Sequence, residues 1–223
     1  MARYLRVVAE IARKDLLLAV RSKRRLNGAA VLALLVVVVF SFVFVRRVED
    51  TTVVAQGALW VALVFAATLS LSRGTATEQR NAAIEGLLLA PVDRSAVYLG
   101  KVCSSTVFVT VVGWVTLGAV TVFLDAAFEA GTLARLVVVF PLAAVGVSAA
   151  GVLVTTLTLR SGVEESMLPV LLVPLLVPVV LAGTELTGLT GPLWSSGWLR
   201  ILAVYDALVL VVGWVGYEFV VAD

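Results

Sequence analysis

The sequence predicts an all-α polytopic membrane protein with six transmembrane helices and an N-terminal amphipathic helix at the membrane surface. Of its 223 residues, 61% are hydrophobic and only 14% are charged, and the mean hydropathy is +1.08. Soluble domains hold about half apolar and about a quarter charged residues. The apolar residues also gather in runs close to the ~20 residues that cross ~30 Å of hydrocarbon.

Six apolar runs of this length fill most of the chain. Residues 1–223 are therefore interpreted as a single transmembrane domain, with no soluble domain of useful size. The expected spans are residues 27–45, 53–71, 102–124, 136–159, 167–183 and 199–221.

The residues before the first span, 1–26, have helical periodicity. Apolar side chains recur in steps of three or four, at Leu5, Val8, Ala12, Leu16 and Ala19. Basic residues fill much of the rest, and no short apolar stretch ends in a cleavage site, so the segment does not resemble a signal peptide. We expect a helix lying in the interface plane, its cations near anionic lipid headgroups. It is either a topology anchor or a lever that moves with a partner.

Basic residues orient the spans through the positive-inside rule. With the N-terminus inside, 13 of the 17 Lys and Arg residues fall on the cytoplasmic side and four fall outside. We therefore expect a multi-pass protein of the cell membrane with both termini cytoplasmic. The polar segment 73–101, between the second and third spans, then faces the cytoplasm.

This segment reads RGTATEQRNAAIEGLLLAPVDRSAVYLGK and is the longest polar interruption of the chain. Residues 75–78 have capping-box spacing, which predicts a helix starting near Ala76. The helix should end before Pro91, because the residue preceding a proline avoids the helical region. Asp93 or Ser95 is then expected to cap a further helix that leads into the third span.

Two interpretations of the segment 73–101 stay open. It is either an interfacial linker that hides its leucines in headgroups, or a docking element whose leucines fill a groove on a cytoplasmic partner within a polar rim. A second cytoplasmic contact element is expected after the fourth span, where residues 161–164 again have capping-box spacing. The expected docking residues are Glu78, Arg80, Glu85, Leu87, Leu88, Leu89, Pro91, Arg160 and Glu164.

The fifth span carries Pro169, Pro174 and Pro178. Each proline removes a backbone donor and can kink the helix, which membrane helices tolerate when neighbours satisfy the freed carbonyls. These residues predict either ordinary kinks or a bendable span that helps to open a cavity.

The fourth span places small residues four apart, at Gly146/Ala150 and Val147/Gly151. This spacing allows close helix packing, and we interpret it as structural.

Asp206 is the one acid well inside a span, about 10 Å along the sixth helix from Leu199 at 1.5 Å per residue. An intramembrane carboxyl is by default a candidate functional site. Near the outer interface it could instead reach the headgroups or accept a hydrogen bond from a neighbouring helix. Arg135, also expected near the outer face, is a candidate partner.

Trp194 and Trp198 are expected outside, one helical turn apart. An aromatic belt at the membrane interface explains them. The alternative is a contact with a flat hydrophobic ligand or a partner helix at the outer face.

Several chemistries are excluded by composition. The sequence has no histidine and one cysteine, Cys103, so His-based catalytic sets, H-E-x-x-H zinc sites and internal disulfides cannot form. It also lacks the G-x-x-x-x-G-K-[ST] phosphate-binding loop and paired carboxylates in the spans. We expect no enzyme activity, metal or bound cofactor in this chain. Any energy should come from outside this chain, through a cytoplasmic contact, which favours the docking interpretation.

The stretch from Gly57 to Lys101 and the stretch LTLRSGVEESMLPVLLVPLLVPVVLAG carry a family resemblance. They resemble the heme exporter protein B family of bacterial and archaeal cytochrome c maturation, small permeases of ATP-binding cassette type. The matching positions are Gly57, Trp60, Arg73, Glu78, Glu85, Leu87, Leu88, Pro91, Lys101, Arg160, Pro174 and Pro178. Chain length, six spans and topology agree with the family. The sequence departs from it at Asn81-Ala82, where members often carry an acidic residue followed by glycine.

The resemblance implies that two copies of this chain pair with two copies of a cytoplasmic P-loop ATPase, which binds the ATP. It also implies a haem-handling membrane protein and a haem chaperone as partners, in which haem ligation resides, and membrane lipid but no nucleic acid. Haem is the implied cargo, or haem-loaded chaperone is released. Two rivals remain: a permease of the same class for a lipid or drug, and a non-transporting membrane scaffold.

Overall fold

The computed structural model describes residues 2–21, 23–44, 51–80, 93–160 and 167–222. In these ranges the chain is almost wholly helical and contains no strand. The elements are α1 (Ala2–Arg21), α2 (Lys23–Phe44), α3 (Thr51–Arg80), α5 (Arg94–Phe123), α6 (Ala130–Arg160), α7 (Leu168–Thr187), the 3-10 helix η2 (Leu193–Ser195) and α8 (Gly197–Ala222). The predicted all-α fold is confirmed.

Six of the described helices, α2, α3, α5, α6, α7 and α8, are long and apolar enough to cross a membrane. This agrees with the six predicted spans. The helices α3, α5 and α6 have 30 or 31 residues each, about 45 Å at 1.5 Å per residue. Because the hydrocarbon core is only ~30 Å thick, these three helices extend beyond it.

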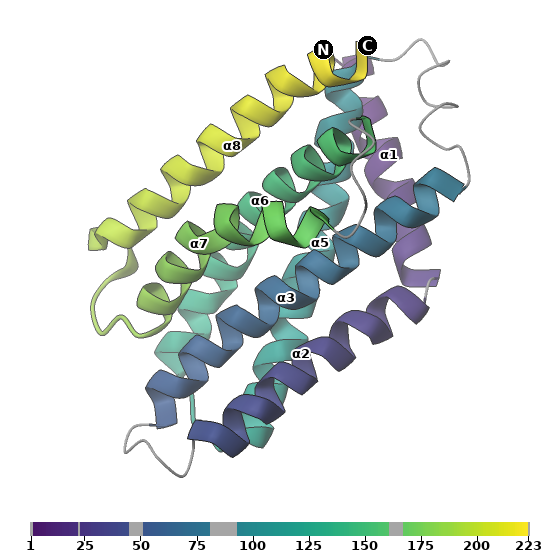
Figure 1. Ribbon diagram of the computed structural model, residues 1–223. Helices are drawn as coiled ribbons and strands as arrows, with labels where there is room; N and C mark the ends of the chain where they lie inside the picture. The colour runs from purple at the N-terminus through teal and green to yellow at the C-terminus, as the bar shows by residue number, and fades with distance from the viewer. Residues whose placement is uncertain (1, 22, 45–50, 81–92, 161–166, 223) are drawn as a thin grey trace.

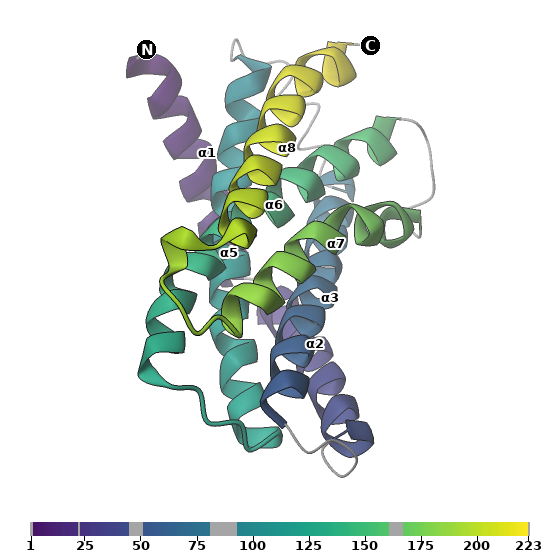
Figure 2. The same ribbon diagram turned by 90° about the vertical axis from the view of Figure 1, so that its left-hand side faces the viewer.

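The helices form one bundle in which α3 and α6 are central. More than half of the span residues of these two helices are buried, against fewer than a third in α2 and α8. Figure 1 and Figure 2 show both chain ends at one end of the bundle, where α3 also ends and α5 begins. The end of α2, the start of α3 and the connection between α5 and α6 lie at the opposite end.

The helix α1 does not stand apart from the bundle, because it packs along the first turns of α5. A Cβ added at Gly100 of α5 would lie 2.8 Å from Cβ of Ile11 and 3.1 Å from the carbonyl oxygen of Val8. Ile11 and Ala19 are buried. The predicted amphipathic helix is therefore present, and its apolar side is covered at least in part by protein.

The two helix starts predicted near the polar segment 73–101 compare differently with the structure. The prediction that a new helix starts near Ala76 is wrong, since α3 continues without a break to Arg80. The capping-box residues do not start a new helix because the helix of the span is already formed. Extending that helix adds one hydrogen bond per residue and needs no new nucleus. The prediction of a further helix is confirmed, since α5 starts directly after Asp93. The predicted capping is not, because Asp93 stands at the N-cap position without a side-chain capping bond.

The three prolines of α7 are not equivalent. Pro169 is the second residue of the helix, where a backbone N–H has no helical partner in any case. Its expected role as a kink is therefore wrong. Pro174 and Pro178 lie inside the helix, as does Pro141 in α6, which the sequence analysis did not single out.

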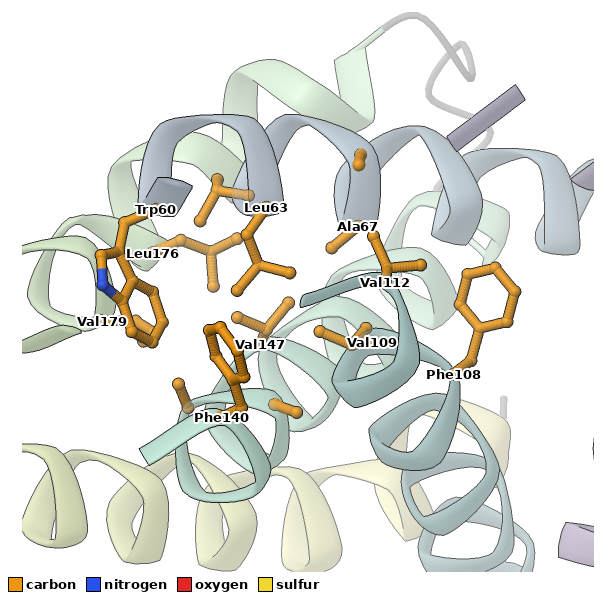
Figure 3. Close-up of a cluster of buried hydrophobic side chains, with 14 of the residues drawn as sticks. Trp60, Leu63, Ala67, Phe108, Val109, Val112, Phe140, Val147, Leu176 and Val179 are labelled. Carbon is orange, nitrogen blue, oxygen red and sulfur yellow. The ribbon is translucent and has the colours of Figure 1, made fainter. Parts of the chain in front are cut away.

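The core is built around Trp60 of α3, whose ring is fully buried (Figure 3). The ring packs against Phe140 of α6 with centroids 5.6 Å apart. It also lies directly on Gly183 of α7, where an added Cβ would overlap it. The Trp60 Nε1–H donates to Oγ1 of Thr187 at 2.9 Å, and the Thr187 hydroxyl donates to the Gly183 carbonyl at 2.7 Å. Every polar atom of this contact thus has a partner.

Candidate functional site

The first candidate site is the end of the bundle that holds both chain ends. There α3 ends at Arg80 and α5 begins at Arg94, while α6 ends at Arg160 and α7 begins at Leu168. Both predicted docking segments therefore connect helix ends. Of the predicted docking residues, Glu78, Arg80 and Arg160 lie in the last turns of α3 and α6. The others, Glu85, Leu87, Leu88, Leu89, Pro91 and Glu164, lie outside the described residues.

The second candidate site surrounds Asp206, in the middle of the span Gly197–Tyr217. Its side chain is only 3% exposed, and neither carboxylate oxygen has a hydrogen-bond partner among the described residues. The carboxylate lies against Gly146 of α6, where an added Cβ would overlap it. Among the described residues no neighbouring helix donates a hydrogen bond to this side chain. Its burial against protein does not favour the alternative in which it extends to the outer headgroups.

The expected pairing of Arg135 with Asp206 is also absent. The Arg135 guanidinium donates through Nη2 to Oγ1 of Thr132 on its own helix, at 2.7 Å. Its Nε is buried without a partner among the described residues. Arg135 lies in the second turn of α6 and Asp206 lies about 14 Å along α8 from its first residue at 1.5 Å per residue.

Tyr205, the neighbour of Asp206, fixes α8 to the proline-containing helix. Its hydroxyl donates to the carbonyl oxygen of Leu175 in α7 at 2.7 Å. Leu175 directly follows Pro174 and precedes Pro178 by three residues, so this bond meets α7 between its two internal prolines. The prolines remove the helical donors of the Val170 and Pro174 carbonyls, whereas the Leu175 carbonyl keeps the N–H of Val179. Asp206 and Tyr205 together therefore bring three helices, α6, α7 and α8, into contact near mid-span.

The two outer tryptophans have different environments. Trp194 belongs to η2 and is 78% exposed. Trp198 lies in the first turn of α8, packs partly against the core and donates its backbone N–H to Oγ of Ser196 at 3.2 Å. Trp194 is therefore the more exposed of the two and the more open to contact with lipid or a partner.

Among the described residues, no group of three or more Cys, Asp or Glu side chains could hold a metal ion. Sequence reasoning singled out Asp206 and Gly146 separately but missed that they touch. It also missed Tyr205. A polar residue on one span and a glycine on another would have suggested a contact, yet nothing in the sequence says which glycine faces which residue.

A bundle with six helices long and apolar enough to cross a membrane is the architecture of a multi-pass membrane protein. The chain belongs to the CcmB family: the family model described as CcmB protein matches residues 6–218, nearly the whole chain. This family is the membrane permease component of the haem exporter for cytochrome c maturation and works with an ATPase. A search of curated proteins finds no match.

Proposed function

We propose that this chain lies in the cell membrane with both termini cytoplasmic and docks a P-loop ATPase through residues 73–101 and 160–166. ATP binding and hydrolysis on the partner would then move the ends of α3, α5, α6 and α7. The spans would relay that motion to the outer face. In this proposal the chain binds no nucleotide or metal of its own.

The observation that supports docking is the convergence of helix ends. The segment 73–101 includes the end of α3 and the start of α5, and residues 160–166 join the end of α6 to α7. The central helices α3 and α6 are the most buried of the six. A partner that grips their ends therefore acts directly on the core of the bundle, which a headgroup linker would not do.

The membrane partners are proposed from the family. A haem-handling membrane protein and a haem chaperone would complete the complex, with two copies of this chain and two of the ATPase. The output is either haem carried across the membrane or haem-loaded chaperone released on the far side. We favour release, because the spans contain no obvious haem ligand or cavity signature, although the family name favours haem export.

The test is an affinity pull-down of the full chain from its native membranes, with identification of the co-purified proteins and an ATPase assay. The informative variant is Leu88→Asp, which places a charge in the predicted apolar anchor. The matched control is Ala127→Asp, which adds the same carboxylate to the exposed connection at the opposite end of the bundle. That connection already carries Asp125 and Glu129, so a further acid there should be tolerated.

We expect an ATPase and a haem-handling protein with the wild type and with Ala127→Asp, and neither with Leu88→Asp. If an ATPase co-purifies without haem-handling proteins, the result would indicate a transporter for a cargo other than haem. Absence of an ATPase from all three preparations would contradict the docking proposal and favour the alternative of a non-transporting membrane scaffold. Retention of the ATPase by Leu88→Asp would move the docking site away from the leucines.

A further inference from the structure

Tyr4, in the first turn of α1, links three helices at the end of the bundle that holds both termini. Its hydroxyl donates to Oγ of Ser95, the second residue of α5, at 3.0 Å. The same hydroxyl accepts the indole N–H of Trp214, near the end of α8, at 3.2 Å. A tyrosine hydroxyl offers one donor and two acceptor positions, so this single side chain bonds to both neighbours at once.

We propose that Tyr4 is a positioning residue that transmits movement from the start of α5 to α8. This inference rests on the proposed docking function. Ser95 lies inside the proposed docking segment 73–101, as the second residue of α5. A displacement of that segment by a partner therefore moves Ser95, whose hydroxyl accepts the hydrogen bond from Tyr4.

Close packing of α1 against the start of α5 supports the hydrogen bonds of Tyr4. The close approach of Gly100 and Ile11 holds α1 and the start of α5 together, with only 2.8 Å available for a Cβ at Gly100. Tyr4 lies two turns of helix before Ile11, on the same side of α1. The helices α1 and α5 therefore move as one body at this end, and the Trp214–Tyr4 bond fastens α8 to that body.

The far side of the link is the second candidate site. Trp214 lies eight residues after Asp206, about 12 Å along α8 at 1.5 Å per residue. Movement of Trp214 along the helix axis thus reaches Asp206 and Tyr205, which contact α6 and α7. The proposed route runs from the docking segment through Ser95, Tyr4 and Trp214 to mid-span.

The experiment uses the complex of the full chain with its ATPase, reconstituted in vesicles. A nitroxide spin label on Cys103, the single cysteine, which is exposed on α5, reports on α5. In a second protein, Cys103→Ser with Ile201→Cys places the label on an exposed position near the start of α8. The spectra are compared with and without a non-hydrolysable ATP analogue, in the wild type and in Tyr4→Phe.

In the wild type we expect the nucleotide to shift both spectra. In Tyr4→Phe the shift at residue 103 should persist. The equilibrium constant for the shift at residue 201 should fall about two- to tenfold, as expected for the loss of a typical hydrogen bond. Ser95→Ala and Trp214→Phe each remove one of the two hydrogen bonds. Each should keep the shift at residue 103 and weaken the shift at residue 201, so the proposal can be tested even if Tyr4→Phe folds poorly.

The matched control is Trp114→Phe, the same exchange on α5. Its ring contacts Phe140, and phenylalanine keeps an aromatic ring there, so both shifts should remain at wild-type values. A full shift at residue 201 in Tyr4→Phe, Ser95→Ala and Trp214→Phe would overturn the role of Tyr4 and leave docking intact. A wild-type complex in which neither label responds would overturn the docking proposal and this inference together.

Discussion

The contacts Trp60–Gly183 and Asp206–Gly146 are built alike and differ in one respect. In each, a buried side chain from one helix lies on a glycine of another, with no room for a Cβ. The Trp60 N–H is bonded to Thr187, which in turn bonds to the Gly183 carbonyl. The carboxylate oxygens of Asp206 have no partner among the described residues.

The difference indicates which helix contact is fixed and which can change. A satisfied polar group in an apolar surrounding stabilises the one arrangement that satisfies it, whereas an unsatisfied one raises the free energy of that arrangement. We therefore interpret the α3–α7 contact as permanent. Of the two contacts, Asp206–Gly146 between α6 and α8 is the one that a second conformation can alter without losing a side-chain hydrogen bond.

The largest effect is expected from Trp60→Ala, which empties the centre of the fixed contact. Large aromatic-to-alanine changes in protein cores cost about 3–5 kcal/mol, and the Thr187 hydroxyl also loses its donor. The measurement is thermal unfolding of the purified protein in detergent. Trp114→Ala is the control, because Trp114 touches the same Phe140 ring but is 38% exposed. Equal losses in the two variants would contradict the central place of Trp60.

Thr187→Val should destabilise the protein by about 1–3 kcal/mol, because it leaves the buried Trp60 N–H without an acceptor at nearly constant volume. Thr184→Val is the matched control in the same helix. Thr184 is half-buried and bonds only back to the Val180 carbonyl, so its loss should be small. Unfolding temperatures that are the same for both variants would show that the Trp60 bond adds nothing.

Asp206→Val should have the opposite sign and stabilise the protein by up to about 1–3 kcal/mol, since it removes a buried unsatisfied group without creating another. Asp206→Asn keeps a polar group in place and should gain less. The same unfolding assay measures both. A loss of stability in Asp206→Val as large as that in Thr187→Val would reveal a partner for the carboxylate.

We expect haem-exporter activity to fall in Asp206→Val although the protein is more stable, if this contact must open.

The smallest effect is expected from Tyr205→Phe. It removes one hydrogen bond to the Leu175 carbonyl, worth about 0.5–1.5 kcal/mol, and leaves the ring in place. That carbonyl can still accept its helical N–H from Val179, so no buried group is orphaned. A loss larger than that of Thr187→Val would mean that the α7–α8 bond, rather than the Trp60 contact, fixes the bundle.

The sequence predicts the number and order of the helices well, because runs of ~20 apolar residues are rarely anything else. It predicts helix ends less well. The second span agrees with the predicted one to within two residues, but a new helix was expected to start near Ala76, where α3 instead continues to Arg80. A capping box marks a position where a helix can start. It does not show whether a preceding helix continues across that position.

The contacts between helices were not predictable from the sequence. Spans that are apolar on every side carry no stripe that says which face meets a neighbour. Asp206 could be identified as an unusual residue and Gly146 as a packing position, but their contact depends on the rotation of two helices about their axes. The same holds for Tyr4 and Trp214, which lie 210 residues apart.

The seat of Ile11 on Gly100 also bears on how the protein is made. Eighty-nine residues separate the two, so when α1 leaves the ribosome its binding surface does not yet exist. The helix must wait at the membrane surface, apolar side down, until the start of α5 has been synthesised, and its many cations suit it to that interval beside anionic lipid. The helix α1 therefore reaches its final place only after the start of α5 has been synthesised. A bulky N-terminal fusion should therefore interfere with assembly more than one at the same distance from any connection at the opposite end.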